Sequence, residues 1–121
     1  SFINVKINRK GKEYDDNDCK LEIEGEYLNG ERNGKGKEYH DNGLIKFEGE
    51  YLNGNRNGKG KEYNVNGDID FEGEYKDGIR WNGEGSEYNE NGELEFNGEY
   101  KDGKKWNGVL KEYDWETGEE I

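Results

Sequence analysis

The chain has 121 residues, of which 27% are hydrophobic and 40% are charged, and its formal net charge is −12. So few apolar residues cannot assemble an ordinary globular core, and the even spread of negative charge argues against nucleic acid as a partner. An aromatic content of 13%, with nine Tyr and three Trp, argues against a disordered chain. We therefore expect a thin, regular structure.

The N-terminal residues do not follow the pattern of the rest of the chain. Residues 1–8 contain four apolar side chains, Phe2, Ile3, Val5 and Ile7, which predicts an N-terminal cap strand. Residues 9–22 form a partial repeat that contains the single cysteine, Cys19. Because there is no second cysteine, and no stretch has the length of a signal peptide or membrane span, we expect a reducing, cytoplasmic setting.

Four repeats then follow, at about residues 23–46, 47–70, 71–95 and 96–121. Each opens on a short motif that reads IEGEY, FEGEY, FEGEY and FNGEY in turn, and a Glu-Tyr pair recurs later in each unit. Self-similarity at a fixed period is typical of repeat architectures. We predict one domain, residues 1–121, that is a single repeat array. Both ends lie inside a unit, as expected either of a segment cut from a longer array or of ends that serve as caps.

Within a unit, alternation predicts two strands. Phe47 and Tyr51 point to one face while Glu48 and Glu50 point to the other. A polar loop, LNGNRNG, is expected next, and the segment KGKEY is the second strand. Asn-Gly pairs supply the positive φ that tight turns require. The predicted fold class is all-β: tandem antiparallel hairpins in a single elongated, curved, open sheet.

The glycines and charges of the strands have structural interpretations. Gly49, Gly60 and their equivalents are expected to leave room for aromatic rings from the neighbouring unit. The two glutamates of FEGEY are expected to lie opposite the two lysines of KGKEY as a ladder of opposite charges. We therefore interpret these repeated residues as structural residues of the sheet and not as a functional site.

The spacing of the repeated residues resembles a known family. The pattern Phe47-x-Gly49-x-Tyr51-x-x-Gly54-x-x-x-Gly58-x-Gly60 is similar to the MORN (membrane occupation and recognition nexus) repeat. The portion GKGKEY is similar to the variant form of that repeat found in putative antitoxin proteins. The units here have 24 or 25 residues instead of 23, and Tyr63 is one residue out of the usual phase. Which face carries Tyr39, Tyr63, Tyr88 and Tyr113 is left open.

The resemblance implies a half-pipe of hairpins with a groove, and a role as scaffold or adaptor. The aromatic residues expected to line that groove and bind a partner are Tyr27, Tyr51, Tyr75 and Tyr100. We interpret the chain as a noncatalytic scaffold that binds a basic or amphipathic protein segment through an aromatic groove with acidic margins. Two alternatives are a lipid-associating targeting module, which the negative charge disfavours, and an antitoxin or immunity-type binding protein.

The residues that interrupt the repeat are further candidates. Trp81 and Trp106 are inserted into the last two hairpins, where they either form a binding stripe or pack over the backbone of the adjacent unit. Val109 and Leu110 make the last hairpin more apolar, and we expect them to support an end-to-end contact, either with the next repeat of a longer chain or with a second copy in a homo-oligomer.

Catalysis, cofactors and metals are not expected. The few nucleophiles and the single His40 do not combine into a known catalytic pattern, and His40 is interpreted as a solvated turn residue. The acidic clusters DDND and DWETGEE lack the ligand spacing of a calcium loop.

Overall fold

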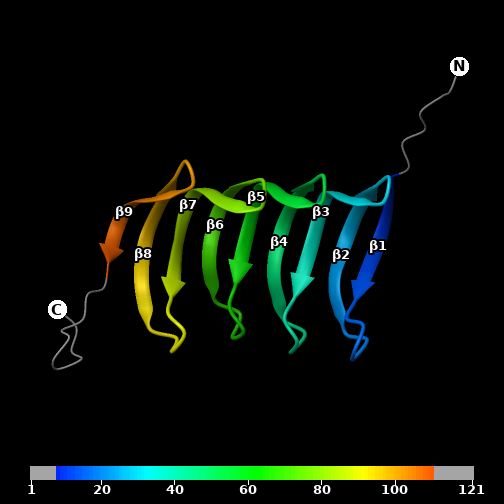
Figure 1. Cartoon of the computed structure of the whole chain (residues 1–121), viewed down its shortest axis with the longest axis horizontal. Helices are drawn as coiled ribbons and strands as arrows, with labels where there is room; N and C mark the ends of the chain where they lie inside the picture. Colours follow the sequence, from blue (N-terminus) through cyan, green and yellow to red (C-terminus); the bar gives the residue numbers. More distant parts are fainter. Residues whose placement is uncertain (1–7, 111–121) are drawn as a thin grey trace, which may run out of the picture.

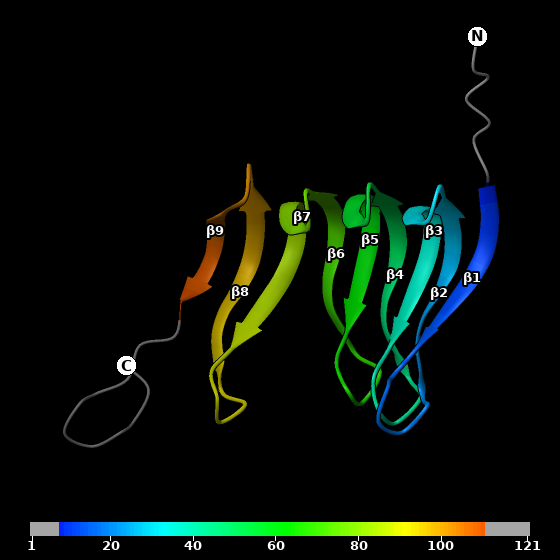
Figure 2. The ribbon, with the colours of Figure 1, turned by 45° about the vertical axis from the view of Figure 1, so that its right-hand side comes forward.

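The computed structural model describes residues 8–110, which form nine β-strands in one antiparallel sheet (Figure 1). The strands are β1 (Asn8–Tyr14), β2 (Leu21–Leu28), β3 (Glu31–Tyr39), β4 (Ile45–Leu52), β5 (Asn55–Tyr63), β6 (Ile69–Lys76), β7 (Ile79–Tyr88), β8 (Leu94–Lys101) and β9 (Lys104–Leu110). Each pairs with its neighbours in sequence, and the strands are visibly bent along their length (Figure 2). The predicted all-β, open-sheet fold is confirmed. The predicted cap strand lies almost wholly outside the described residues.

Two-residue turns connect the strands of each repeat. At the β4–β5 turn, Asn53 and Gly54 have φ values of 51° and 86°, and two successive positive φ values suit the twist of a hairpin. The predicted loop LNGNRNG is therefore wrong. Leu52 still belongs to β4, and β5 begins at Asn55. The second Asn-Gly pair lies inside β5, where Gly58, with φ 98°, accommodates a bulge against β4.

A row of glycines crosses the sheet. Gly36, Gly49, Gly60 and Gly73 are paired in register on four successive strands. A Cβ on Gly49 would lie 2.6 Å from the Cα of Gly60, so these strands approach too closely for side chains. A Cβ on Gly60 would lie 2.6 Å from the Phe47 ring and 2.9 Å from the Tyr75 ring. The prediction that these glycines make room for rings is confirmed at Gly60.

The inserted tryptophans change the strand register. In the β4–β5 hairpin, Gly49 pairs with Gly60, whereas in the β6–β7 hairpin Gly73 pairs with Gly83, not with Gly85, which is the counterpart of Gly60 in sequence. Trp81 fills part of the bulge, so the two strands slip by two residues relative to the earlier hairpin. The β8–β9 hairpin, which contains Trp106, shows the same pattern.

No membrane-spanning helix is found within residues 8–110.

Candidate functional site

The two faces of the sheet differ in composition. One face carries the Phe and Tyr rings of the first strand of each repeat, and it is here called the ring face. The opposite face, which carries the Lys and Glu side chains that alternate with those rings, is called the charged face. The described core consists of six side chains of the ring face: Phe47, Tyr51, Phe71, Tyr75, Phe96 and Tyr100.

Three of the four tyrosines predicted to bind a partner belong to this core. Tyr51, Tyr75 and Tyr100 are at most 8% exposed, and Tyr27 is partly buried. The rings meet edge to face, as where the Phe47 and Tyr75 centroids lie 5.1 Å apart. Rings buried this deeply stabilise the sheet and offer a partner little surface.

Each of the first three tyrosines belongs to a hydrogen-bonded triad. The Tyr51 hydroxyl donates to Glu38 at 2.5 Å, and Arg56 donates to the same carboxylate from Nε at 2.8 Å and from Nη2 at 2.9 Å. The equivalent triads are Glu13–Tyr27–Arg32 and Glu62–Tyr75–Arg80. Because the glutamate comes from the preceding hairpin, every triad joins two repeats.

The guanidinium groups also cover the phenylalanine rings. Arg56 Cζ lies 4.2 Å from the Phe47 centroid, and Arg80 Cζ lies 4.9 Å from that of Phe71. In the last hairpin Lys105 takes this place, pairing with Glu87 at 2.5 Å and lying over Phe96. Among the described residues, bidentate contacts between an arginine and a glutamate therefore occur in the three triads and not in the last hairpin.

The triads shift the pKa values of their members. Burial alone would raise the pKa of Glu38, but hydrogen bonds from Arg56 and Tyr51 bring it below the ordinary value. Burial, followed by the hydrogen bond to Glu38, raises the pKa of Tyr51 far above its ordinary value. Glu62 and Tyr75 show the same directions. The folded state thus favours a charged glutamate beside a neutral tyrosine.

The arginines of the triads were missed from the sequence, where they stood in a predicted loop. Their position carries a signal: Arg32, Arg56 and Arg80 each follow the tyrosine of the opening motif by five residues. The glutamate of the Glu-Tyr pair recurs with them.

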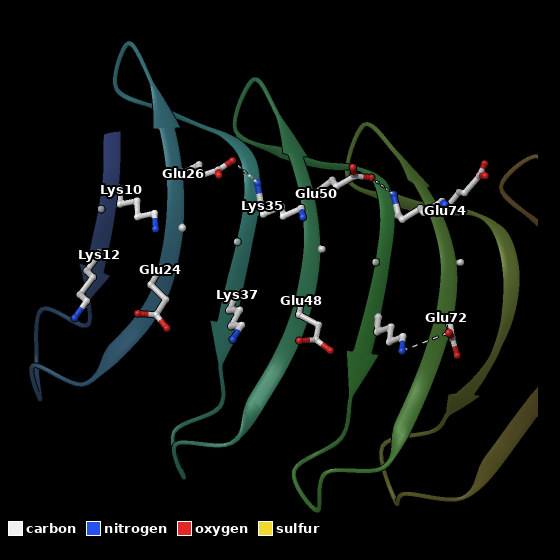
Figure 3. Close-up of a pocket in the computed structure, with 18 residues that line it drawn as sticks. Lys10, Lys12, Glu24, Glu26, Lys35, Lys37, Glu48, Glu50, Glu72 and Glu74 are labelled. Carbon is white, nitrogen blue, oxygen red and sulfur yellow. Dashed lines mark hydrogen bonds and ion pairs between the residues drawn. The ribbon is translucent and has the colours of Figure 1, made fainter. Parts of the chain in front are cut away.

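A groove of about 1300 Å³ runs along the charged face across β1–β6 (Figure 3). Six glycines form its floor, and six lysines and six glutamates line its sides, so the lining carries no net charge. The lysines come from β1, β3 and β5, and are Lys10, Lys12, Lys35, Lys37, Lys59 and Lys61. The glutamates come from β2, β4 and β6. This groove has no aromatic lining, so it differs from the predicted aromatic groove, and the partner-binding role of the four tyrosines stays a prediction.

Positive and negative bands alternate along the groove. Register pairs Lys37 with Glu48, and Glu48 with Lys61, as the predicted ladder of opposite charges requires. Glu50 faces the bulge of β5 and is paired with Lys35 of β3 instead of with Lys59. Each strand contributes two side chains of one sign, and neighbouring strands lie about 4.8 Å apart. The sign of the lining therefore changes about every 5 Å along the groove.

Several glutamates of the groove accept hydrogen bonds from uncharged donors. Glu50 accepts a hydrogen bond from the backbone N–H of Lys59 at 2.6 Å, and Glu48 accepts one from the Tyr63 hydroxyl at 2.5 Å. Tyr39 donates to Glu24 in the same way. Tyr39 and Tyr63 therefore lie on the charged face, which answers the question that alternation left open. Tyr88 is about half exposed, and Tyr113 lies outside the described residues.

The alternation of charge stops at β7. Glu84 is paired with Glu72 on one side and with Glu99 on the other, and Ser86 stands where Lys61 stands in β5. Like charges directly opposite one another are unfavourable in a sheet. The groove and its alternating bands thus belong to the first six strands.

The two inserted tryptophans have different surroundings. Trp81 is partly buried, and its ring lies against Gly103 of the next hairpin turn, where a Cβ would approach it to 3.1 Å. Trp106 is 66% exposed. Of the two interpretations, packing over the adjacent unit holds for Trp81. The partner-binding role of Trp106 stays a prediction.

The residues predicted to support self-association lie at the end of the described sheet. The backbones of Val109 and Leu110 pair with Asn97 and Phe96 in β8. Their side chains lie outside what the structure describes, so self-association stays a prediction.

The residue types that bind metals are scattered over the part of the chain that the structure describes. Within residues 8–110, His, Cys, Asp and Glu side chains form no group of three that could hold a metal ion. His40, predicted to be a solvated turn residue, is partly buried, and its Nε2 lies 2.8 Å from the carbonyl oxygen of Tyr63 at the end of β5. It therefore links two repeats.

Comparison with known proteins identifies the repeat. The family model described as the MORN repeat matches residues 24–45 and 47–69. The two matched segments are MORN repeats. The two matches cover the hairpins β2–β3 and β4–β5, and the same triad recurs in β6–β7. No curated protein and no solved structure matches this MORN-repeat chain. MORN repeats are in general noncatalytic modules that mediate protein or membrane interactions.

Proposed function

We propose that this chain is a noncatalytic scaffold that binds a protein segment along the groove of its charged face. The observation that carries the proposal is the continuous groove across six strands, floored by glycine backbone and lined by charges of alternating sign. A floor without side chains lets a bound segment approach the backbone of the sheet closely. The long lysine and glutamate side chains stand on both sides of it.

The charges define what the segment must offer. The lining has six positive and six negative side chains, while the whole chain carries a net charge of −12. The surplus negative charge therefore lies outside the groove, where it favours encounter with a basic protein. Inside the groove, a matching segment carries both signs, with a positive side chain beside each glutamate band.

The proposal replaces the tyrosine surface expected from the sequence. Tyr51, Tyr75 and Tyr100 stabilise the sheet from the ring face, and the groove lies on the charged face. The tyrosines thus contribute to binding by keeping the strands that form the groove in place.

The experiment selects peptides that bind the intact chain from a random displayed library. The double variant Lys37→Gln, Lys59→Gln removes two exposed lysines from the groove. The matched control, Lys20→Gln with Lys104→Gln, changes the net charge equally at exposed positions outside the groove. We expect selected peptides to bind the groove variant about tenfold more weakly, which is about 1.4 kcal/mol, and to bind the control as they bind the wild type.

A membrane role has a different outcome. Co-flotation of the chain with anionic vesicles at physiological salt, together with peptide binding that neither lysine pair affects, would favour the lipid alternative. If the groove variant and the control lost affinity for the peptides equally, binding would reflect a general attraction of charges. That result would contradict binding in the groove.

A further inference from the structure

Successive hairpins are joined by a hydrogen bond from each turn to the hairpin before it. The N–H of Gly54 donates to the Arg32 carbonyl at 2.9 Å, and the N–H of Gly78 donates to the Arg56 carbonyl at 2.9 Å. In the last described hairpin, the N–H of Gly103 donates to the carbonyl of Trp81 at 3.0 Å. Each acceptor lies near the start of a second strand, so the contact recurs with the repeat.

Side chains strengthen this contact in the later hairpins. The N–H of Asp77 donates to Asn57 Oδ1 at 3.2 Å, and the N–H of Asp102 donates to Asn82 Oδ1 at 3.1 Å. At the last of these contacts the Trp81 ring also lies against Gly103. A tryptophan ring, its carbonyl oxygen and the following asparagine together hold an Asp–Gly turn.

The end of the described sheet presents the same three groups. Trp106 and Asn107 stand in β9 where Trp81 and Asn82 stand in β7, and both are exposed. The last turn within residues 8–110, Asp102–Gly103, is already docked on Trp81. Trp106, at 66% exposure, is the most exposed of the large hydrophobic side chains that the structure describes.

Charge around this end suits an acidic turn. Lys101 Nζ lies 4.8 Å from the centroid of the Trp106 ring, as Lys76 Nζ lies 4.7 Å from that of Trp81, and Lys104 is exposed nearby in sequence. At Trp81, where a lysine lies over the indole ring in the same way, the docked turn begins with Asp102. The same arrangement at Trp106 favours a turn that begins with Asp.

We propose that Trp106 and Asn107 form a docking site for the Asp–Gly turn of a β-hairpin supplied by another polypeptide. The turn glycine donates its N–H to the Trp106 carbonyl and lies flat against the indole ring. The N–H of the turn aspartate donates to Asn107 Oδ1. The interface continues, in a second chain, the contact that joins the last two hairpins of this one.

The test uses a cyclic peptide with the sequence of residues 71–80, FEGEYKDGIR, closed by a disulfide between added terminal cysteines. Closure is needed because isolated hairpins are marginally stable. Nuclear magnetic resonance of the isotope-labelled full chain monitors the Trp106 indole N–H and the Asn107 side-chain amide. We expect both signals to shift and to saturate at submillimolar peptide, and Trp106→Ala to weaken binding at least tenfold.

Two further changes separate docking from general adhesion. Gly78→sarcosine in the peptide removes one N–H donor without adding a side chain, and we expect at least a fivefold loss of affinity. Asn107→Ala in the chain removes the second acceptor and should weaken binding about threefold. A folded peptide that leaves both signals unshifted at 1 mM, or binds equally well with sarcosine, would overturn the proposal.

Discussion

The smallest unit that explains this molecule is the Glu–Tyr–Arg triad. Its members come from two repeats, as where Glu38 of β3 receives hydrogen bonds from Tyr51 of β4 and Arg56 of β5. Withdrawing a charged carboxylate from water, even in part, is costly unless it is paired and hydrogen-bonded, and here both conditions are met. With only 27% hydrophobic residues, the chain uses partly buried polar contacts where other folds use aliphatic packing.

Removing one donor from a triad should destabilise the fold. Tyr51→Phe leaves Glu38 with one fewer partner in a buried setting, and we expect the free energy of unfolding to fall by about 1–3 kcal/mol. Tyr88→Phe, at a tyrosine that is 48% exposed, is the matched control and should change it by less than about 0.5 kcal/mol. Chemical denaturation measures both. Equal effects would mean that the hydroxyl of Tyr51 is not engaged as described.

The triads also fix how stability depends on pH. The pKa values of Glu38 and Glu62 lie below 4.5 in the folded state, so their contribution is present above pH 4.5 and is lost as pH falls through the folded values. The pKa of Tyr63 is raised from 10.0 to about 12, so its contribution is present below pH 10.0 and is lost as pH rises. Tyr51 has the same direction.

We therefore expect a stability plateau between about pH 5 and pH 9, with losses on both sides. Urea titrations across this range measure it. A free energy of unfolding that kept rising below about pH 4 would contradict the assignment of charged glutamates to the folded state.

The β-hairpin is the repeated element, and sequence reasoning found its strands and turn residues because period-two alternation and Asn-Gly pairs act locally. It misjudged the second strand. Nothing local shows that Asn57–Gly58 sits in a bulge inside β5 when the same dipeptide at Asn53–Gly54 reverses the chain. The outcome depends on pairing with β4, which is a contact between strands. The role of Arg56 was missed for the same reason.

The inserted tryptophans should differ in energy because their neighbours differ. Trp81→Ala removes a ring packed on the next turn and should cost about 1–3 kcal/mol of unfolding free energy. Trp106→Ala removes a ring that is 66% exposed and should cost less than about 0.5 kcal/mol. Thermal and chemical unfolding of the two single variants provide the comparison. A larger loss from Trp106→Ala would show that its ring is packed within the chain.

At the scale of the whole molecule, the sheet separates stability from recognition. The ring face holds the buried rings and triads, and the charged face holds the groove with its balanced lining. The sequence indicated which residues alternate, and so which share a face. It did not indicate that the tyrosines fill their own face, because burial depends on how rings of successive repeats meet, such as Phe47 with Tyr75.

The limits of the groove follow from register. Its charge bands need lysine strands and glutamate strands to alternate, and this holds from β1 to β6. In β7, Glu84 and Ser86 take the places of the two lysines of β5, and the shifted register beside Trp81 puts Glu84 opposite Glu72. The charge pattern therefore ends where the tryptophan-bearing hairpins begin, so recognition by the groove and by the Trp106 end occupies different parts of the array.

The location of a bound segment can be read directly by nuclear magnetic resonance of the labelled chain with a peptide selected as described above. Binding along the groove predicts amide shifts concentrated on the Lys, Glu and Gly residues of β1–β6, such as Lys37, Gly49 and Lys59. The shifts should weaken as salt rises, because the contacts are charged and exposed. Shifts concentrated instead on the ring face or on the loops, with the groove residues unmoved, would contradict a scaffold that binds through its charged groove.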